Sequence, residues 1–157
     1  MDEIDRKIVV AVQQDGAAGL SDLAKVSGLS VSATAERLKR LEERGVVRGW
    51  HAALDPAEVG CPLLVFLRVT IRPGREDTAF RRLIRKLDTV LECHQLTGEW
   101  SYLVKLRLPD IAALETLMAE EFRTLAGMER LAVEIAMGSV KETALLPVFR
   151  AVDEEEG

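Results

Sequence analysis

The sequence has few residues that would cross-link the chain or anchor it in a membrane. It holds only two cysteines, Cys61 and Cys93, which are too few for a disulfide framework. No apolar run approaches the roughly 18 consecutive residues of a membrane helix. The acidic opening Met1-Asp2-Glu3 is unlike a signal peptide. We therefore expect a cytoplasmic protein.

Basic residues are not in excess either, which at first argues against a nucleic-acid partner. The net charge is −5, but the acidic excess is unevenly placed. Residues 1–54 hold eight basic and eight acidic residues, so the whole excess lies in residues 55–157. Within residues 31–50, five basic residues stand against three acidic ones. A local basic face can bind phosphates while the whole molecule is acidic, although the same balance is typical of a solvated helix face.

Two short helical patterns meet at a glycine break in residues 21–47. Ser21 is predicted to cap the first helix, because a serine oxygen can accept from unpaired N–H groups. The second helix opens after Ser30 and stops at Gly45, where glycine accepts the left-handed conformation that a helix end needs. Its core-facing residues are Ala35, Leu38 and Leu41. A helix-turn-helix places its second helix in the DNA major groove.

The flanking patterns extend this element to residues 1–54. Residues 2–14 repeat Ile4, Ile8 and Val12 on one helical stripe. Residues 46–54 form a β-like run, which predicts a wing after the third helix. We therefore expect an N-terminal winged helix-turn-helix.

A linker at 55–62, marked by two prolines and a glycine, separates this part from a second domain predicted over 63–148. The expected strands are 63–71, 90–97, 102–108 and 131–140, and the expected helices are 77–87 and 110–125. The order β-α-β-β-α-β is that of a ferredoxin-like domain, so the fold class is α+β. One sheet face, with Leu64 and Phe66, then needs a cover, which a dimer would provide. Residues 149–157 are predicted to form a disordered acidic tail.

An ordered set of motifs along residues 2–148 resembles one known family. They are Asp2-Glu3-Ile4-Asp5-Arg6-Lys7-Ile8, Ser21-x-Leu23-Ala24, Gly28-Leu29-Ser30-x-Ser32, Arg37-x-x-Arg40-Leu41-Glu42-x-x-Gly45-Val46-Val47-x-Gly49, Val90-Leu91-Glu92-Cys93-His94, Thr97-Gly98, Tyr102-Leu103 and Val140-Lys141-x-Thr143-x-x-Leu146-Pro147. The chain resembles the leucine-responsive and asparagine regulators, the Lrp/AsnC family.

The resemblance implies a prokaryotic transcription regulator that binds double-stranded DNA. It also implies a ferredoxin-like (RAM, ACT-like) sensor domain, a homodimer that assembles into larger oligomers, and a small-molecule effector, usually an amino acid, near the Thr-Gly loop. It implies no other cofactor and no membrane partner.

Candidate DNA contacts follow from helical spacing on the second helix of the motif. N-terminal residues of such a helix approach base edges, whereas arginines suit phosphates. The predicted set is Ser30, Ser32, Ala33, Glu36, Arg37, Lys39, Arg40 and Arg48. Glu36 stands where the family often has a basic residue. It either weakens phosphate attraction or accepts a hydrogen bond from a cytosine. A winged helix that binds protein instead of DNA is the alternative.

The candidate effector site is the loop Thr97, Gly98, Glu99, Trp100, Ser101 and Tyr102. Gly98 would let the backbone approach a ligand closely. The family pattern is nearer to Thr-Gly-Asp-x-Asp-Tyr, so Ser101 replaces an acid that would suit an ammonium group. A hairpin without a ligand is the other interpretation.

Metal and enzyme functions are disfavoured. Cys61, Cys93, His51 and His94 lack a metal-binding spacing, and strand alternation points Cys93 and His94 to opposite faces. Trp50 and Trp100 are typical packing or interface residues. No nucleophile–base pair or phosphate-binding loop occurs. A sirohaem-decarboxylase-like enzyme of the same architecture, and a ligand-independent architectural DNA-binding protein, remain as alternative functions.

Overall fold

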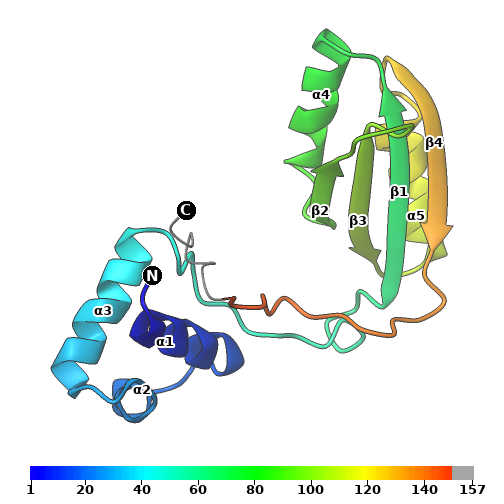
Figure 1. Ribbon diagram of the computed structural model, residues 1–157. Coiled ribbons are helices and arrows are strands. Elements are labelled where there is room, and N and C mark those ends of the chain that lie inside the picture. The colour runs from blue at the N-terminus through cyan, green and yellow to red at the C-terminus, as the bar shows by residue number, and fades with distance from the viewer. Residues whose placement is uncertain (150–157) are drawn as a thin grey trace. The chain divides into compact units, whose positions relative to one another are not determined.

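The computed structural model describes residues 1–149 and divides into two compact units. Residues 1–53 and 141–149 form the first, and residues 54–140 form the second. Figure 1 labels their helices and strands. Among the described residues, no helix is long and apolar enough to cross a membrane.

The first unit holds three helices, α1 (Glu3–Gln14), α2 (Leu20–Ser27) and α3 (Val31–Glu43) (Figure 1). Their buried stripes meet in one small core of Ile8, Val9, Val12, Leu23 and Leu41. Helix α1 begins with a reciprocal capping box in which the side chains of Asp2 and Asp5 each accept from the other's backbone N–H. The helix predicted over 2–14 and its stripe are confirmed.

The ends of the two following helices agree with the sequence at all but one point. Ser30 caps α3 by accepting from the N–H of Ala33 at 3.3 Å. Gly28 and Gly45 both have positive φ, at 73° and 69°. The prediction for Ser21 is wrong, because α2 already begins at Leu20 after Gly19, which supplies no side-chain cap. Ser21 therefore lies inside the first turn instead of ahead of it.

The predicted β-wing is not formed, since residues 46–54 contain no strand in the described chain. An extended run becomes part of a sheet only where another strand pairs with it, and no strand of the first unit is available to it among residues 1–149. The segment is instead attached to α3 by the indole of Trp50, whose Nε1 donates to Glu42 at 3.2 Å.

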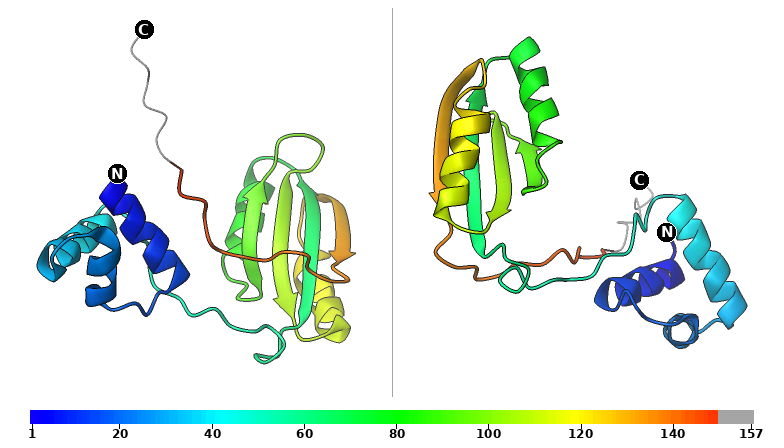
Figure 2. Two further views of the ribbon diagram at one scale, coloured as in Figure 1. Left: turned by 60° about the horizontal axis from the view of Figure 1, so that its bottom comes forward. Right: turned by 180° about the vertical axis from the view of Figure 1, so that it is seen from behind.

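The second unit is a four-stranded antiparallel sheet with two helical segments (Figure 2). Its elements are β1 (Leu63–Ile71), α4 (Arg75–Ile84), β2 (Val90–Gln95), β3 (Tyr102–Leu108), α5 (Ile111–Leu117) continued by the π-helical turn η1 (Met118–Phe122), and β4 (Met128–Ile135). The sheet order β2-β3-β1-β4 confirms the ferredoxin-like topology and the α+β class.

One face of the sheet packs against the helices and forms the core. Alternate residues of β1 and β3, such as Val65, Leu67 and Val104, contact Phe80 of α4 and Phe122 of η1, and all five are fully buried. The fourth strand contributes less than predicted: Val133 and Ile135 are 42% and 45% exposed. They point to this same face, beside Leu67 and Val65, but β4 is an edge strand.

The opposite face of the sheet carries charged pairs around a small apolar centre. Arg68 pairs with Glu134 at 3.3 Å, and Lys105 pairs with Glu92 at 3.2 Å. Phe66 is half-buried there. Leu64, predicted to need a cover, is already only 8% exposed.

The C-terminal boundary differs from the prediction. The last strand ends at Ile135 instead of continuing to residue 140, and residues 141–149 belong to the helical unit instead of the sheet unit. The side-chain amide of Gln13 donates to the carbonyl of Leu146 at 3.1 Å and accepts from its N–H at 2.8 Å. Val148 adds an apolar contact to the helical core. Most of the predicted acidic tail, residues 150–157, lies outside the described residues.

Candidate functional site

Helix α3 has a buried side and an exposed side that match a DNA-reading helix. Thr34 and Leu41 are buried, and Leu38 is half-buried between them. On the other side four polar residues are exposed: Ser32, Glu36, Lys39 and Arg40. Ala35, predicted to face the core, is half-buried. The outward set is therefore close to the sequence prediction.

A buried hydroxyl pair fixes α2 against α3, and the sequence did not point to it. The Oγ of Ser27 lies 3.0 Å from Oγ1 of Thr34, and both residues are buried. Ser27 also donates to the carbonyl of Ala24 at 3.1 Å, so Thr34 is the donor between the two hydroxyls. A sequence signal for this contact was present, because two residues with small hydroxyl side chains occupy core-facing positions on either side of Gly28.

Arg37, which the sequence predicts as a phosphate contact, is ion-paired within the chain. Its Nη1 bonds Oδ2 of Asp2 at 2.5 Å and Oδ1 of Asp5 at 2.8 Å. The Arg37 side chain is only 23% exposed. The N–H of Asp5 and then the Arg37 guanidinium hold the pKa of the Asp2 carboxyl below its ordinary 3.8. Arg37 thus ties α3 to the start of α1, and its charge is compensated within the chain.

All but one of the remaining predicted DNA residues are exposed, as a contact requires. Ser30 and Ser32 are exposed and lie with their hydroxyl oxygens 3.2 Å apart. Lys39 makes only a long, exposed ion pair with Glu43 at 3.7 Å, which is easily exchanged. Arg48 is exposed after α3, and Ala33 is half-buried.

The loop predicted to bind an effector is held to the ends of β1 and β4. Ser101 donates its N–H to Val69 at 2.9 Å, and its hydroxyl accepts from the N–H of Ile71 at 3.3 Å. Glu99 pairs with Arg130 at 2.5 Å, and the Arg130 guanidinium stacks on the ring of Trp100 at 4.3 Å. The Ser101 hydroxyl therefore has a structural partner in the backbone.

Beside this loop lies a cavity of about 270 Å³ in the second unit. Gly98, Trp100, Ser101 and Tyr102 of the predicted site line it, whereas Thr97 and Glu99 do not. Gly98 has φ of 110°, a conformation that other residues rarely adopt. The loop prediction thus included four lining residues and two that lie outside the lining.

Three further polar residues line the cavity, and sequence reasoning missed all of them: Asp77, Arg81 and Gln95. Asp77 Oδ1 accepts from the Tyr102 hydroxyl at 2.6 Å, and Oδ2 accepts from Arg81 Nε at 2.8 Å. Arg81 Nη2 donates to Gln95 Oε1 at 3.1 Å. The i,i+4 spacing of Asp77 and Arg81 on a predicted helix was the available signal, but this spacing also occurs in ordinary surface pairs.

The electrostatics of this cluster follow from its burial and from the ion pair. Burial, and then the hydrogen bond to Asp77, raise the pKa of Tyr102 to about 12. The hydrogen bond to Asp77 raises the pKa of the Arg81 guanidinium. Tyr102 is therefore a proton donor throughout the neutral range and keeps Asp77 oriented.

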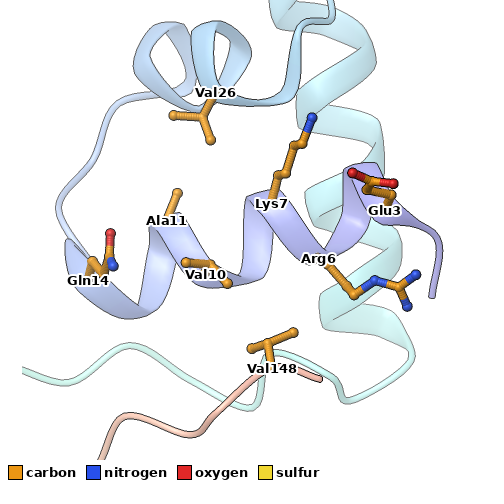
Figure 3. Close-up of a pocket in the computed structure, with 8 residues that line it drawn as sticks. All are labelled: Glu3, Arg6, Lys7, Val10, Ala11, Gln14, Val26 and Val148. Atoms are coloured by element: carbon orange, nitrogen blue, oxygen red, sulfur yellow. The ribbon is translucent and has the colours of Figure 1, made fainter. Parts of the chain in front are cut away.

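A second cavity, of about 360 Å³, lies in the helical unit. Figure 3 shows α1 running between Val26 on one side and Val148 on the other. Its charged lining residues are Glu3, Arg6 and Lys7. No residue of the predicted sites lines it.

In the described part of the chain, no three His, Cys, Asp or Glu side chains are grouped in a way that could hold a metal ion. Cys93 is half-buried, and burial raises the pKa of its thiol, so the reactive thiolate is disfavoured.

Comparison with known proteins identifies the family. Residues 1–42 match the AsnC-type helix-turn-helix domain, and residues 64–146 match the Lrp/AsnC ligand binding domain. The chain belongs to the Lrp/AsnC family of transcriptional regulators. It is 35% identical over 150 residues to the leucine-responsive regulatory protein of Escherichia coli K12, covering 94% of this chain and 92% of that one.

Solved structures agree with this assignment. A transcriptional regulator from Neisseria meningitidis in complex with L-Met superimposes with a TM-score of 0.89 at 32% identity, covering 94% of this chain and 96% of that one. An AsnC family regulator from Agrobacterium tumefaciens gives a TM-score of 0.88 at 30% identity, covering 94% and 97%. This Lrp/AsnC regulator thus combines a helix-turn-helix with a ligand-binding domain, as the sequence resemblance implied. Because these relatives are regulators, the decarboxylase-like and architectural alternatives are not favoured.

Proposed function

We propose that α3 binds double-stranded DNA in a sequence-specific manner through its exposed face. Ser32, Ala33 and Glu36 read base edges near the N-terminus of the helix, where such helices approach the bases. Lys39, Arg40 and Arg48 contact phosphates, and Ser30 positions the first turn. The observation that carries this proposal is the division of α3 into a buried Thr34–Leu41 side and an exposed polar side.

Arg37 has a separate role in this proposal. Because its guanidinium is already held by Asp2 and Asp5, it orients α3 and is not one of the phosphate contacts. The DNA surface then contains three basic residues, and one copy would bind weakly. Affinity should therefore depend on several copies acting together.

We further propose that the protein is a homodimer that assembles into larger oligomers and that its effector is an amino acid. The sheet face opposite the helices carries ion pairs such as Arg68–Glu134 around the half-buried Phe66, and this mixed surface supports self-association. The cavity beside Gly98 and Trp100 supports an effector of small size. A relative of this fold has been solved with L-Met, and L-Met belongs to the chemical class that we propose for the effector.

The test is selection of bound DNA from a random pool, with and without an amino-acid mixture, followed by titration of the selected site at several salt concentrations. We expect a defined motif and a log affinity that falls by about 0.9 per phosphate contact for each log unit of salt. Recovery of no motif, or binding that ignores salt, would contradict DNA reading by α3. An unchanged selection and affinity with every amino acid would contradict the effector.

A further inference from the structure

The lining of the cavity in the second unit includes one ion pair, Asp77 and Arg81. The two residues are one turn apart on α4, and their bond of 2.8 Å is backed by Tyr102 at 2.6 Å and Gln95 at 3.1 Å. Their side chains are 23% and 43% exposed. The pair is therefore fixed in place by neighbours and still reachable from solvent.

Both members of the pair have hydrogen-bonding capacity beyond these contacts. Each carboxylate oxygen can accept two hydrogen bonds, and the guanidinium has five N–H donors. The bonds described use one acceptor position on each Asp77 oxygen and two of the Arg81 donors. A ligand can therefore bind to both groups without breaking the pair.

Of the described residues that line this cavity, Asp77 is the only acid and Arg81 the only base. Position 101, where the family pattern has an acid, offers a hydroxyl that already accepts from the backbone of Ile71. Glu99 is paired with Arg130 and does not line the cavity. The negative charge for a ligand's ammonium group is thus present, but it comes from α4 instead of from the loop.

We infer that Asp77 and Arg81 bind the ammonium and carboxylate groups of a free α-amino acid with an apolar side chain. This inference rests on the proposed effector function. The two charges of a zwitterion are separated by about the length of an ion pair, so an antiparallel arrangement places each charge against its opposite. The apolar side chain lies against Ile71, Pro73, Leu96 and Trp100, which complete the lining.

A purely structural role is the competing explanation, in which the pair only joins α4 to Gln95 at the end of β2 and to Tyr102 at the start of β3. Ligand analogues separate the two explanations. A structural pair makes no distinction between an amino acid, the acid that lacks its ammonium group and the amine that lacks its carboxylate. A binding pair rejects both analogues, because each leaves one charged group unpaired.

The experiment is calorimetric titration of the full chain with L-methionine, L-leucine and L-phenylalanine and with the deaminated and decarboxylated analogue of each. We expect the wild type to bind an amino acid about tenfold or more tightly than either analogue. Asp77→Asn should lose this affinity and bind the amino acid and the deaminated acid equally. Arg81→Gln should also lose this affinity and bind the amino acid and the decarboxylated amine equally. Asp88→Asn and Arg82→Gln, exposed on or just after α4, are the matched controls and should behave as the wild type.

The outcomes are distinguishable. Failure of the wild type to bind any amino acid overturns the proposed effector and this inference with it. Binding without discrimination against the analogues, or discrimination that persists in Asp77→Asn, overturns only the role of the pair. The wild-type comparison needs no variant, so it decides the question even where a substitution prevents folding.

Discussion

The hydroxyl groups of Ser27 and Thr34 lie 3.0 Å apart inside the helix-turn-helix and join its two helices. Ser27 donates to Ala24, so Thr34 supplies the proton of the shared bond. A buried polar contact of this kind is directional, and it sets the angle at which α3 leaves the turn.

Thr34→Val removes the donor of this bond with little change in shape. Because it leaves Ser27 buried with one partner fewer, it should destabilise the helical unit by about 1–2 kcal/mol. Ser27→Ala/Thr34→Val should cost less than the sum of the two single changes. Denaturant unfolding followed by Trp50 fluorescence in a Trp100→Phe background measures this, because the chain has only two tryptophans. Additive costs would mean that the two hydroxyls act independently.

Arg37→Met and Arg40→Met should differ in how they change DNA binding. Arg40→Met removes a proposed phosphate contact, so the slope of log affinity against log salt should shrink by about 0.9. Arg37→Met removes the tie to Asp2 and Asp5, so it should lower affinity and the stability of the helical unit while leaving the slope unchanged. Fluorescence anisotropy at several salt concentrations measures both. A slope reduced equally by both variants would make Arg37 a phosphate contact after all.

The lowered pKa of Asp2 predicts an acid-sensitive helical unit. Its stabilisation is fully present above the ordinary value of 3.8 and is lost as the pH falls through the lower value of the folded state. The melting temperature should therefore fall with pH in this acidic range. Asp2→Asn should flatten the dependence, and Glu3→Gln, a neighbour outside the capping box, should retain it. Thermal melting of the wild type and both variants, from pH 5 down to a pH about two units lower, measures this dependence.

Tyr102 should titrate far above an ordinary tyrosine. It is the only tyrosine in the chain, so near-ultraviolet difference absorbance reports it alone. At pH 10, where an ordinary phenol is half ionised, it should remain almost wholly protonated, because its pKa is about 12. Its contribution to stability is fully present below pH 10 and is lost as the pH rises through 12. Asp77→Asn should lower the midpoint without restoring 10, because burial is the larger cause. A wild-type midpoint near 10 would contradict the buried hydrogen bond.

Gln13→Ala should release the C-terminal segment from the helical unit. The side chain makes two hydrogen bonds to the backbone of Leu146, which together should contribute about 1 kcal/mol. The amide of Leu146 should then exchange with solvent several-fold faster, while core amides of α1 stay protected. Gln14→Ala is the adjacent control. Equal exchange in the wild type and Gln13→Ala would mean that the segment is not held by this contact.

Much of the architecture could be predicted because it depends on repeating patterns. The stripe of α1, the alternation in Leu63–Ile71 and Tyr102–Leu108 and the glycines at 28 and 45 are local signals, and the structure has them where the sequence placed them. The wing and the course of residues 141–149 could not be predicted in this way, because they depend on which partner an extended segment finds.

The two candidate sites also differ in how far local sequence patterns could predict them. The residues of α3 follow from one helix and its buried side, so helical spacing was enough to place them. The cavity lining comes from the end of β1, from α4 and from the β2–β3 connection, and Asp77, Arg81 and Gln95 meet Tyr102 only when these elements pack. Arg37 illustrates the same limit, since its spacing on α3 is compatible with a phosphate and only the position of α1 gives it Asp2 and Asp5.

By itself the sequence determined that the chain is a helix-turn-helix followed by a ferredoxin-like sheet, because hydrophobic periodicity and turn residues act within a few positions of the chain. Only the tertiary structure decided which charges are free for a partner and which are already paired. Ion pairs and hydrogen bonds between buried hydroxyls form between residues that packing brings together. The spatial distances between these residues cannot be calculated from their separation in the sequence.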